Sequence, residues 1–201
     1  MPVYQEPYHK LVLEKPEARV LNVQVEPGDT SLFHIHANNI FYVAISGSKV
    51  MLEDSNHDAR KVELPDGWIG DNTTYQARPH IHRIANIGEN LLWLVAVENL
   101  HNPADSKHFN QSSENIVLQD NSFTVYKYLL HSNEIITEHS HKFPCLLINI
   151  SKNAKLQAIN RTSAKISSLN RGGYLWLEKG AVHEISNLGG AELEFLEVLI
   201  K

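Results

Sequence analysis

The chain has 201 residues, of which 42% are hydrophobic and 20% are charged, and its formal net charge is −5. It contains no apolar run of about 18 residues and no long Lys/Arg cluster, so neither a membrane span nor a nucleic-acid partner is expected. The N-terminal residues lack the basic and apolar regions of a secretory signal, and the single cysteine, Cys145, cannot form an intramolecular disulfide. These features predict a cytoplasmic protein with one large domain or two compact ones.

Short β-rich runs, separated by Gly, Pro, Asn and Asp, dominate the sequence, and no long stretch has the apolar spacing of a helix. The expected strands are residues 19–25, 40–46, 91–98, 123–130, 145–151 and 193–200. Many short strands with frequent turns favour an all-β sandwich or barrel. Residues 99–114 are polar and poor in strand formers, which predicts a linker between domains at 1–100 and 113–201.

An internal repeat supports this division. The segment HIHANNIFYVAIS, which starts at His34, matches HSHKFPCLLINIS, which starts 105 residues later at His139. Further along, HRIANIG from His82 matches HEISNLG from His183, with an offset of 101 residues. Two His-x-His pairs, each followed at a similar distance by His-x-x-x-Asn-x-Gly, indicate a duplicated domain.

The repeated histidines have the spacing of a metal site. Residues i and i+2 of a strand point to the same face, so each His-x-His pair presents two imidazoles together, and a third can arrive from a distant strand. The predicted metal ligands are His34, His36, His82, His139, His141 and His183. Imidazole suits divalent transition metals; Fe, Zn, Ni, Mn and Cu are the candidates, with Fe or Zn favoured.

With these motifs the chain resembles the cupins, whose first motif contains Gly-x5-His-x-His and whose second ends in His-x-x-x-Asn. The matching residues are Gly28, His34, His36, Gly47, His82 and Asn86 in the first half, and His139, His141, Gly172, Gly180, His183 and Asn187 in the second. The resemblance covers nearly the whole chain. It implies two tandem jelly-roll β-barrels, the arrangement of a bicupin, in which we expect the asparagines and glycines to shape turns.

Both halves depart from the cupin pattern at the glutamate ligand, which is replaced by Ile40 in the first half and by Cys145 in the second. Neither half is therefore expected to assemble three histidines and one glutamate. Such three-histidine sites resemble those of the thiol and diketone dioxygenase branches of the superfamily. Cys145 is either a small core residue or a thiolate ligand that would favour Zn or Cu.

Two further residues are candidates for a catalytic role. Tyr42 is in phase with Ile40 and can bring a hydroxyl to the first site. Arg78 shares the parity of His80 and His82 if the strand is regular, although Pro79 interrupts it. Both side chains could orient a substrate.

Three functions are compatible with this pattern. The first is a metal-dependent dioxygenase, or a related lyase or isomerase, that acts on a small organic acid, thiol or diketone. The second is a non-catalytic module that holds a metal-chelated metabolite, and the third is a relic in which metal only fastens the strands. In the first two cases the partner is a small molecule, and the chain is expected to be a monomer or a homodimer.

Overall fold

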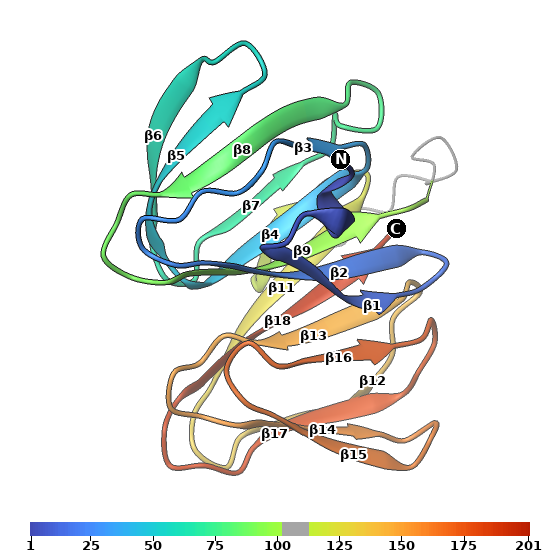
Figure 1. The fold of residues 1–201 in the computed structure, drawn as a ribbon. Coiled ribbons are helices and arrows are strands. Elements are labelled where there is room, and N and C mark those ends of the chain that lie inside the picture. Colours follow the sequence, from blue (N-terminus) through green and yellow to red (C-terminus); the bar gives the residue numbers. More distant parts are fainter. Residues whose placement is uncertain (102–112) are drawn as a thin grey trace. The chain divides into compact units, whose positions relative to one another are not determined.

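A computed structural model describes residues 1–101 and 113–201. The chain divides into two compact units, Met1–His101 and Asn102–Lys201. Figure 1 shows that each unit is built almost entirely of strands. The central part of the predicted linker, residues 102–112, lies outside the described residues.

The first unit contains a short 3-10 helix, η1, and nine strands. They are η1 Val3–Gln5, β1 His9–Glu14, β2 Ala18–Val25, β3 His34–His36, β4 Asn39–Ser46, β5 Ser48–Asp54, β6 Ala59–Leu64, β7 Ile69–Asn72, β8 His80–Asn86 and β9 Leu92–Asn99. A five-stranded sheet has the order β1-β2-β9-β4-β7, and a four-stranded sheet has the order β3-β8-β5-β6. All pairings within these two sheets are antiparallel. This unit is called barrel 1.

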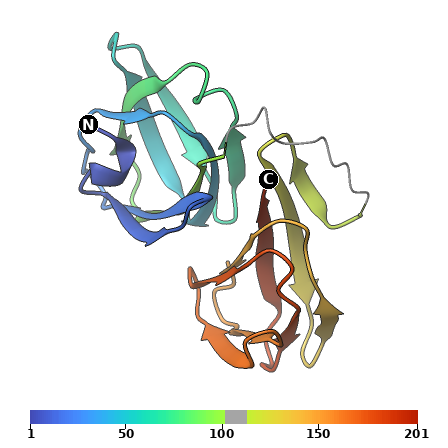
Figure 2. The same cartoon turned by 90° about the vertical axis from the view of Figure 1, so that its right-hand side faces the viewer.

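The second unit, barrel 2, repeats the same design with nine strands. They are β10 Ile116–Gln119, β11 Phe123–Leu130, β12 Ile135–His139, β13 Cys145–Asn149, β14 Leu156–Asn160, β15 Lys165–Leu169, β16 Tyr174–Leu177, β17 His183–Asn187 and β18 Leu193–Ile200. The sheet orders are β10-β11-β18-β13-β16 and β12-β17-β14-β15, which reproduce those of barrel 1 strand for strand. The prediction of two tandem all-β jelly-roll barrels is confirmed. In Figure 2 the sheets of each barrel can be followed as layers around its core.

The six strands expected from sequence all lie in the two five-stranded sheets, and two of them, β11 and β18, have the expected bounds. These strands are rich in buried apolar residues. All residues of β13 are buried, as are seven of the eight residues of β9. The strands of the four-stranded sheets were not among those expected because many of their residues are exposed, as in β6, where only Leu64 is buried.

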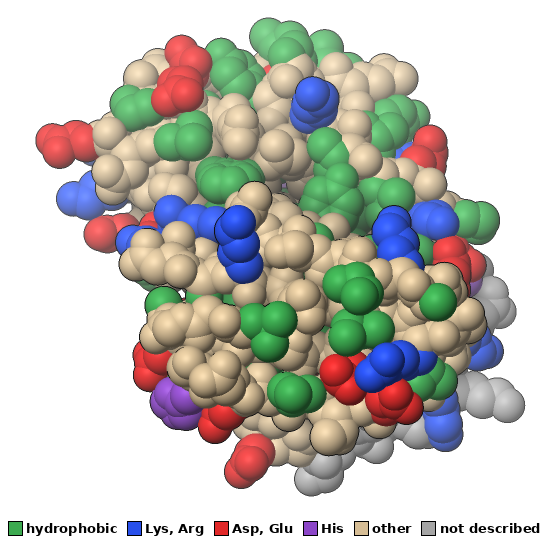
Figure 3. Space-filling view, turned by 90° about the horizontal axis from the view of Figure 1, so that it is seen from below, with side chains coloured by type: hydrophobic (Ala, Val, Ile, Leu, Met, Phe, Trp, Pro, Cys, Tyr) green, Lys and Arg blue, Asp and Glu red, His purple; other side chains and the backbone are tan. Residues whose placement is uncertain are grey.

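Each barrel has its own apolar core between its two sheets. In barrel 1 the core includes Leu21, Val23, Ile40, Ala44 and Leu94. In barrel 2 it includes Tyr126, Leu147, Leu156, Ile185 and Phe195. Among residues 1–101 and 113–201, no helix has the length and apolar character needed to cross a bilayer. On the face drawn in Figure 3, acidic and basic side chains are interspersed, without one large basic patch.

The two repeated asparagines close the turns that follow the third histidine of each motif. The Asn86 amide donates to the carbonyls of Val25 and Asn90, both at 2.8 Å, and its oxygen accepts from the Ser48 hydroxyl at 2.7 Å. The Asn187 amide donates to the carbonyls of Leu130 at 3.0 Å and Ala191 at 2.8 Å. Their expected structural role is confirmed.

Close backbone approach explains one glycine of the motif. A Cβ placed on Gly47 would lie 2.0 Å from the carbonyl oxygen of Leu64, so only glycine fits between β4 and β5. Gly28 has a φ of +87°, a left-handed conformation that side chains rarely adopt. Both positions are required by the backbone, as the sequence predicted.

Replacing Asn86 by alanine should lower the free energy of unfolding by about 2 to 4 kcal/mol, because the buried Val25 carbonyl, the part-buried Asn90 carbonyl and the buried Ser48 hydroxyl lose their partner. Urea unfolding of the variant and of the parent protein measures this difference. The control is Asn90→Ala, whose side chain is exposed and which should change stability by less than about 0.5 kcal/mol. Equal effects at the two positions would show that the Asn86 network contributes little.

Candidate metal centres

Strand pairing brings the three histidines of barrel 1 together. β3 and β8 are antiparallel neighbours in which His34 lies opposite His82 and His36 lies opposite His80. Directly opposed residues share a face of the sheet, so the imidazoles converge inside the barrel. One ligand atom of each of His34, His36 and His82 lies within 4.8 Å of the others.

The tautomer of His34 and the separation of His36 from His82 are those of metal ligands. The His34 Nδ1–H donates to the Leu32 carbonyl at 2.9 Å, so Nε2 carries the lone pair, and that atom is buried without a hydrogen-bond partner in the described residues. His36 Nε2 and His82 Nε2 face each other at 3.0 Å. Unsatisfied buried nitrogens are costly, and a bound cation would satisfy all three.

Burial also keeps these imidazoles neutral. Desolvation, reinforced by the charge of His9, lowers the pKa of His34 to about 4. Desolvation and the neighbouring His34 lower the pKa of His82 to about 3, and the same causes hold the pKa of His36 well below its ordinary value. Only neutral imidazole binds metal, so the triad is in the competent form at neutral pH.

Barrel 2 assembles a different set, which includes a carboxylate. His139, His141 and His183 surround Glu197, and these four residues each place a ligand atom within 4.8 Å of the others. Glu197 Oε1 lies 3.1 Å from His139 Nε2 and 3.0 Å from His183 Nε2, and Oε2 lies 3.4 Å from His141 Nε2. The expectation that neither half could gather three histidines and one glutamate is therefore wrong for the second half.

Backbone carbonyls orient the imidazoles of barrel 2 as they do in barrel 1. His139 Nδ1–H donates to Thr137 at 2.9 Å, and His183 Nδ1–H donates to Ala181 at 3.0 Å, each to the carbonyl two residues earlier. The Nε2 atoms of both histidines are thereby turned towards Glu197. Burial acts to raise the pKa of Glu197, but contacts with the three imidazoles outweigh it and hold this pKa well below its ordinary value.

The atomic separations fit a divalent metal ion. Two ligands that each lie about 2.1 Å from one metal, at right angles, are about 3.0 Å apart. The contacts His36 to His82 (3.0 Å), His183 to Glu197 (3.0 Å) and His139 to Glu197 (3.1 Å) have this separation. His141 Nε2 and Glu197 Oε2 are buried and lack hydrogen-bond partners in the described part of the chain. Both clusters therefore have suitable donors for such an ion.

Glu197 was missed because it does not lie at the expected motif position. It reaches the cluster from the last strand, β18, where it shares the inward parity of Leu193, Phe195 and Leu199. A glutamate in phase with the apolar residues of a buried strand is the sequence signal that could have identified it.

The two barrels differ at one rung of the five-stranded sheet. In barrel 2 Glu197 on β18 pairs with Leu147 on β13, whereas in barrel 1 the corresponding pair is Ala96 on β9 with Tyr42 on β4. The position of Glu197 is thus held by Ala96 in barrel 1, and the position of Leu147 is held by Tyr42. The second site has a charged oxygen donor, and the first has a neutral one.

Ile40 and Cys145, which occupy the usual glutamate positions, are both core residues. Cys145 is 1% exposed, and burial raises the pKa of its thiol well above the ordinary value, so the thiol is protonated. It is absent from the clusters of metal-ligating atoms found among the described residues. The structure supports the core alternative for Cys145 over the thiolate ligand.

The site of barrel 1 opens into a cavity of about 590 Å³. Its wall includes His9, Val23, His36, Tyr42, Leu52, Arg60, Val62, Leu64, Trp68, Tyr75, His80, His82, Ile84 and Leu94. Tyr42 lies edge-on to His36, with ring centroids 6.3 Å apart. Burial raises its pKa well above the ordinary value, so the hydroxyl stays protonated and can donate a hydrogen bond to a ligand.

Aromatic stacking forms the part of the wall next to the histidines. The Tyr75 ring stacks on His36 at a centroid distance of 5.3 Å and on His80 at 5.5 Å, with interplanar angles of 28° and 7°. Tyr75 comes from the turn between β7 and β8 and was not singled out in the sequence. Its ring covers one face of His36 and so limits the space beside that imidazole.

Arg78, the other candidate catalytic residue, is not brought to the site. It lies exposed in the turn that precedes β8, its amide donates to the Thr74 carbonyl at 2.8 Å, and it is absent from the cavity wall. The strand begins only at His80 because Pro79 has no N–H and cannot extend the ladder. Arg60 on β6 supplies the arginine of the cavity wall instead.

A buried contact between a carboxylate and an imidazole lies behind the first triad. Glu6 accepts hydrogen bonds from the amides of Tyr8 (2.9 Å) and Leu32 (3.1 Å), and its Oε2 lies 2.5 Å from His9 Nδ1. The His9 ring is 4.4 Å from that of His34, between centroids. The segment around η1 therefore fixes the Leu32 backbone, whose carbonyl orients His34.

The lowered pKa values predict that the metal-free protein loses stability in acid. A histidine whose folded pKa lies below its unfolded value of 6.5 contributes full stability above pH 6.5, and this contribution falls as the pH approaches the folded value. For His34 the loss between pH 6.5 and 4 is on the order of 3 kcal/mol. The protein is stripped of metal with a chelator, the chelator is removed, and urea unfolding at several pH values then measures this loss of stability.

In the same protein, histidine NMR titration should show His34 and His82 neutral at pH 5. His139 should titrate above 6.5, because its contact with Glu197 outweighs burial and raises its pKa. A His34→Gln variant should have a flatter stability profile between pH 6.5 and 4. Protonation of His34 at pH 6 in the folded, metal-free protein would contradict this electrostatic description.

No protein-family model and no curated protein matches the sequence, but many solved structures match the fold. AerE from Microcystis aeruginosa aligns with 11% identity over 98% of each chain, with a TM-score of 0.65. A cupin 2 conserved barrel domain protein from Leptotrichia buccalis aligns with 12% identity over 95% of this chain and 87% of that one, with a TM-score of 0.59. Oxalate decarboxylase from Lactobacillus farciminis, solved as a formate complex, aligns with 13% identity over 92% of this chain and 77% of that one, with a TM-score of 0.64.

These likenesses extend over both barrels and concern the fold alone, because all three identities are low. Oxalate decarboxylase from Bacillus subtilis, whose structure concerns its Mn(II) centres, shows the same relation with 11% identity, 92% and 69% coverage and a TM-score of 0.60. The repeated topology and the repeated histidine clusters agree with them. The chain has the cupin fold, with two tandem jelly-roll barrels and three histidines gathered in each.

Proposed function

We propose that the protein is a metal-dependent enzyme that acts on a small organic acid or diketone in barrel 1. The reaction class is that of a dioxygenase or a related lyase. The observation that carries this proposal is the open histidine triad, which faces a cavity of about 590 Å³, a volume suited to a small organic molecule.

In this proposal His34, His36 and His82 hold a divalent transition metal, for which Fe, Mn and Zn suit the imidazole donors. Such a metal supplies a Lewis acid that polarises a carbonyl or carboxylate oxygen. The Tyr42 hydroxyl donates a hydrogen bond to the ligand, and the apolar wall excludes water around it. His80, which lines the cavity beside Tyr75, is the residue placed to accept or deliver a proton.

Barrel 2 has a different role in this proposal. His139, His141, His183 and Glu197 form a four-ligand set with one negative charge, which favours tighter retention of a divalent cation than three neutral ligands do. A metal there cross-links β12, β17 and β18 and stabilises the barrel. The oxalate decarboxylases among the structural neighbours support chemistry on small acids in this fold, but their identity to this chain is too low to specify a reaction.

A thiol substrate has less support than an acid or a diketone. The cysteine that prompted it is buried in the core of barrel 2 and stays protonated. If a ligand binds without turnover, the protein is a non-catalytic binding module instead of an enzyme.

Elemental analysis of protein purified without chelator should find up to two metal equivalents per chain. His36→Ala should remove the metal equivalent bound in barrel 1. His141→Ala or Glu197→Gln should lower the metal affinity of barrel 2 by about tenfold or more. His131→Ala, an exposed histidine of barrel 2, serves as the control and should leave both unchanged. Unchanged metal content in all the site variants would refute the assignment.

Turnover is tested on the metal-loaded protein with acetylacetone and oxalate as probes, by oxygen uptake and carbon dioxide release. We expect His36→Ala to abolish any turnover while His141→Ala retains a folded and active barrel 1. Loss of activity only when barrel 2 is altered would place the reaction there and overturn the proposal.

A further inference from the structure

Two tyrosines of β11 face the metal-ligating cluster of barrel 2. In the β11–β18 ladder Tyr126 lies directly opposite Glu197, and Tyr128 lies opposite Phe195. Opposed residues share a face of the sheet, and Phe195 belongs to the core inside the barrel, so both phenol rings point inward. Glu197 is also the diagonal neighbour of Tyr128, a separation that an aromatic side chain can span. Both phenols are therefore on the side of the sheet where Glu197 meets the histidines.

Stacking limits the orientations of these two rings. The Tyr128 ring stacks on Phe195 with centroids 5.2 Å apart and an interplanar angle of 20°. The Tyr126 ring stacks on His141 at 6.2 Å and 24°, and on Tyr128 at 6.2 Å and 15°. A ring held between such neighbours loses little further freedom when its hydroxyl forms a hydrogen bond. Such a bond therefore forms at low entropic cost.

The carboxylate of Glu197 can accept a further hydrogen bond, because its two oxygens offer about four lone-pair sites. Its Oε1 contacts His139 and His183 at 3.1 and 3.0 Å, whereas its Oε2 has a longer contact of 3.4 Å with His141. Burial and then the charge of Glu197 raise the pKa of Tyr128, and this carboxylate also acts on the Tyr128 hydroxyl as a hydrogen-bond acceptor. The hydroxyl therefore remains protonated at neutral pH and can donate to Glu197.

Barrel 1 has apolar residues at all the corresponding positions. In its β2–β9 ladder Leu21 lies opposite Ala96, and Val23 lies opposite Leu94. Leu21 and Val23 take the places of the two tyrosines, and Ala96 takes that of the glutamate. Within one duplicated scaffold, the phenols and the carboxylate are therefore present together or replaced together. This pairing is expected if the phenols act on the carboxylate, since a buried tyrosine hydroxyl needs a hydrogen-bond partner.

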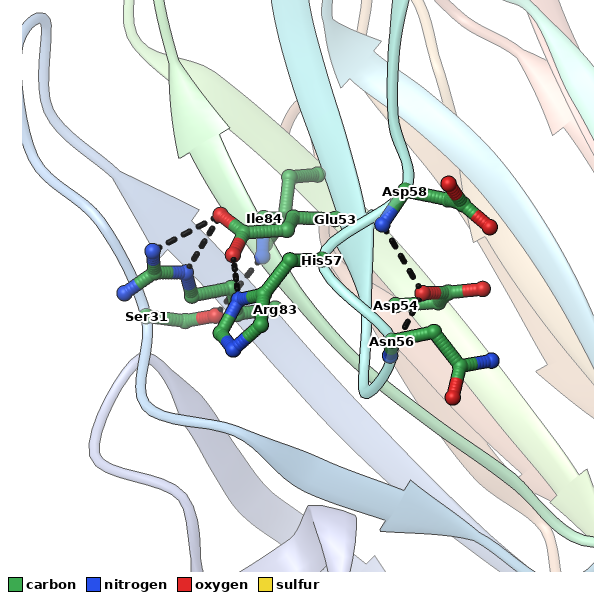
Figure 4. Close-up of polar contacts among 8 residues, drawn as sticks. All are labelled: Ser31, Glu53, Asp54, Asn56, His57, Asp58, Arg83 and Ile84. Carbon is green, nitrogen blue, oxygen red and sulfur yellow. Dashed lines mark hydrogen bonds and ion pairs between the residues drawn. The ribbon is translucent and has the colours of Figure 1, made fainter.

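The acids of β5 do not supply barrel 1 with such a carboxylate. Asp54 lies opposite His82 in the β5–β8 ladder. It accepts the amide of Asn56 at 2.8 Å, and its neighbour Glu53 pairs with Arg83 at 2.7 Å (Figure 4). Among the described residues, neither acid belongs to a cluster that contains the three imidazoles. In that part of the chain, the carboxylate that contacts three imidazoles lies in the barrel that also has the tyrosines.

We propose that Tyr128 is a positioning residue of the barrel 2 centre, whose hydroxyl donates to Glu197 and holds this carboxylate in the orientation that binds a divalent metal ion. Tyr126 packs against His141 and limits the rotation of that imidazole. Partners that contact a ligand and not the metal commonly contribute a factor of about 10 to 100 to metal affinity. The inference rests on the metal assigned to barrel 2 in the proposed function, and it is independent of any reaction in barrel 1.

The test measures Co²⁺ affinity by competition with a chelating dye, in a His36→Ala background that leaves barrel 2 as the metal centre. Tyr128→Phe keeps the ring and its stacking but loses the hydroxyl, and it should weaken Co²⁺ binding by about tenfold. Tyr174→Phe is the matched control and should leave the affinity unchanged. Tyr174 pairs with Ile148, on the face of the sheet opposite to that of Leu147. Unchanged affinity in Tyr128→Phe, or an equal loss in Tyr174→Phe, would overturn the proposal.

A Glu197→Ala background separates the positioning role from a general effect on the fold. With the acceptor removed, Tyr128→Phe should cause no further loss of Co²⁺ affinity. A loss that persists in this background would show that the hydroxyl acts elsewhere and would refute the assignment. Urea unfolding of each metal-free variant checks that it is folded. If the His36→Ala protein binds Co²⁺ and Tyr128→Phe changes nothing, this inference alone fails; if that protein binds no Co²⁺, the metal assigned to barrel 2 fails as well.

Discussion

The antiparallel pairing of β3 with β8, and of β12 with β17, is the constraint on which both sites depend. It places His34 opposite His82 in barrel 1 and His139 opposite His183 in barrel 2, so that residues far apart in sequence share one face. A carbonyl two residues before each of His34, His139 and His183 then fixes the ring through Nδ1. Pairing supplies the proximity, and the carbonyls supply the direction of Nε2.

One common scaffold carries two electrostatically different sites. In barrel 2 the buried carboxylate of Glu197 contacts all three imidazoles. The negative charge of this carboxylate and the imidazoles therefore stabilise each other. In barrel 1 the corresponding rung holds Ala96 and Tyr42, and the nearest carboxylate, Glu6, groups with His9 and His34 instead of contacting all three imidazoles of the triad. Because desolvation of a cation is costly without a compensating anion, an anionic ligand would complete the first site as Glu197 completes the second.

The cost of burying unpaired imidazoles links stability to function in barrel 1. The fold holds His34 and His82 in neutral forms that protonation would destabilise. A bound cation would also give the buried Nε2 atom of His34 the partner that it lacks among the described residues. The buried pair of Glu6 and His9 holds the backbone behind His34 and so extends this arrangement to the N-terminal segment.

The sequence by itself determined the duplication, the all-β fold and the six histidines. The alternation of side chains along a strand and the spacing of a repeated motif can both be read from the order of residues. The same holds for Asn86 and Asn187, whose turns are formed by nearby residues. Tertiary structure alone decided which other side chains join each site. Glu197 lies on β18, 14 positions after His183, and only the register of β13 with β18 directs it inward beside Leu147. Arg60 replaces Arg78 at the cavity because β8 begins after Pro79, whereas β6 pairs regularly with β5. Such contacts depend on the register between strands, which residue spacing within one strand does not specify.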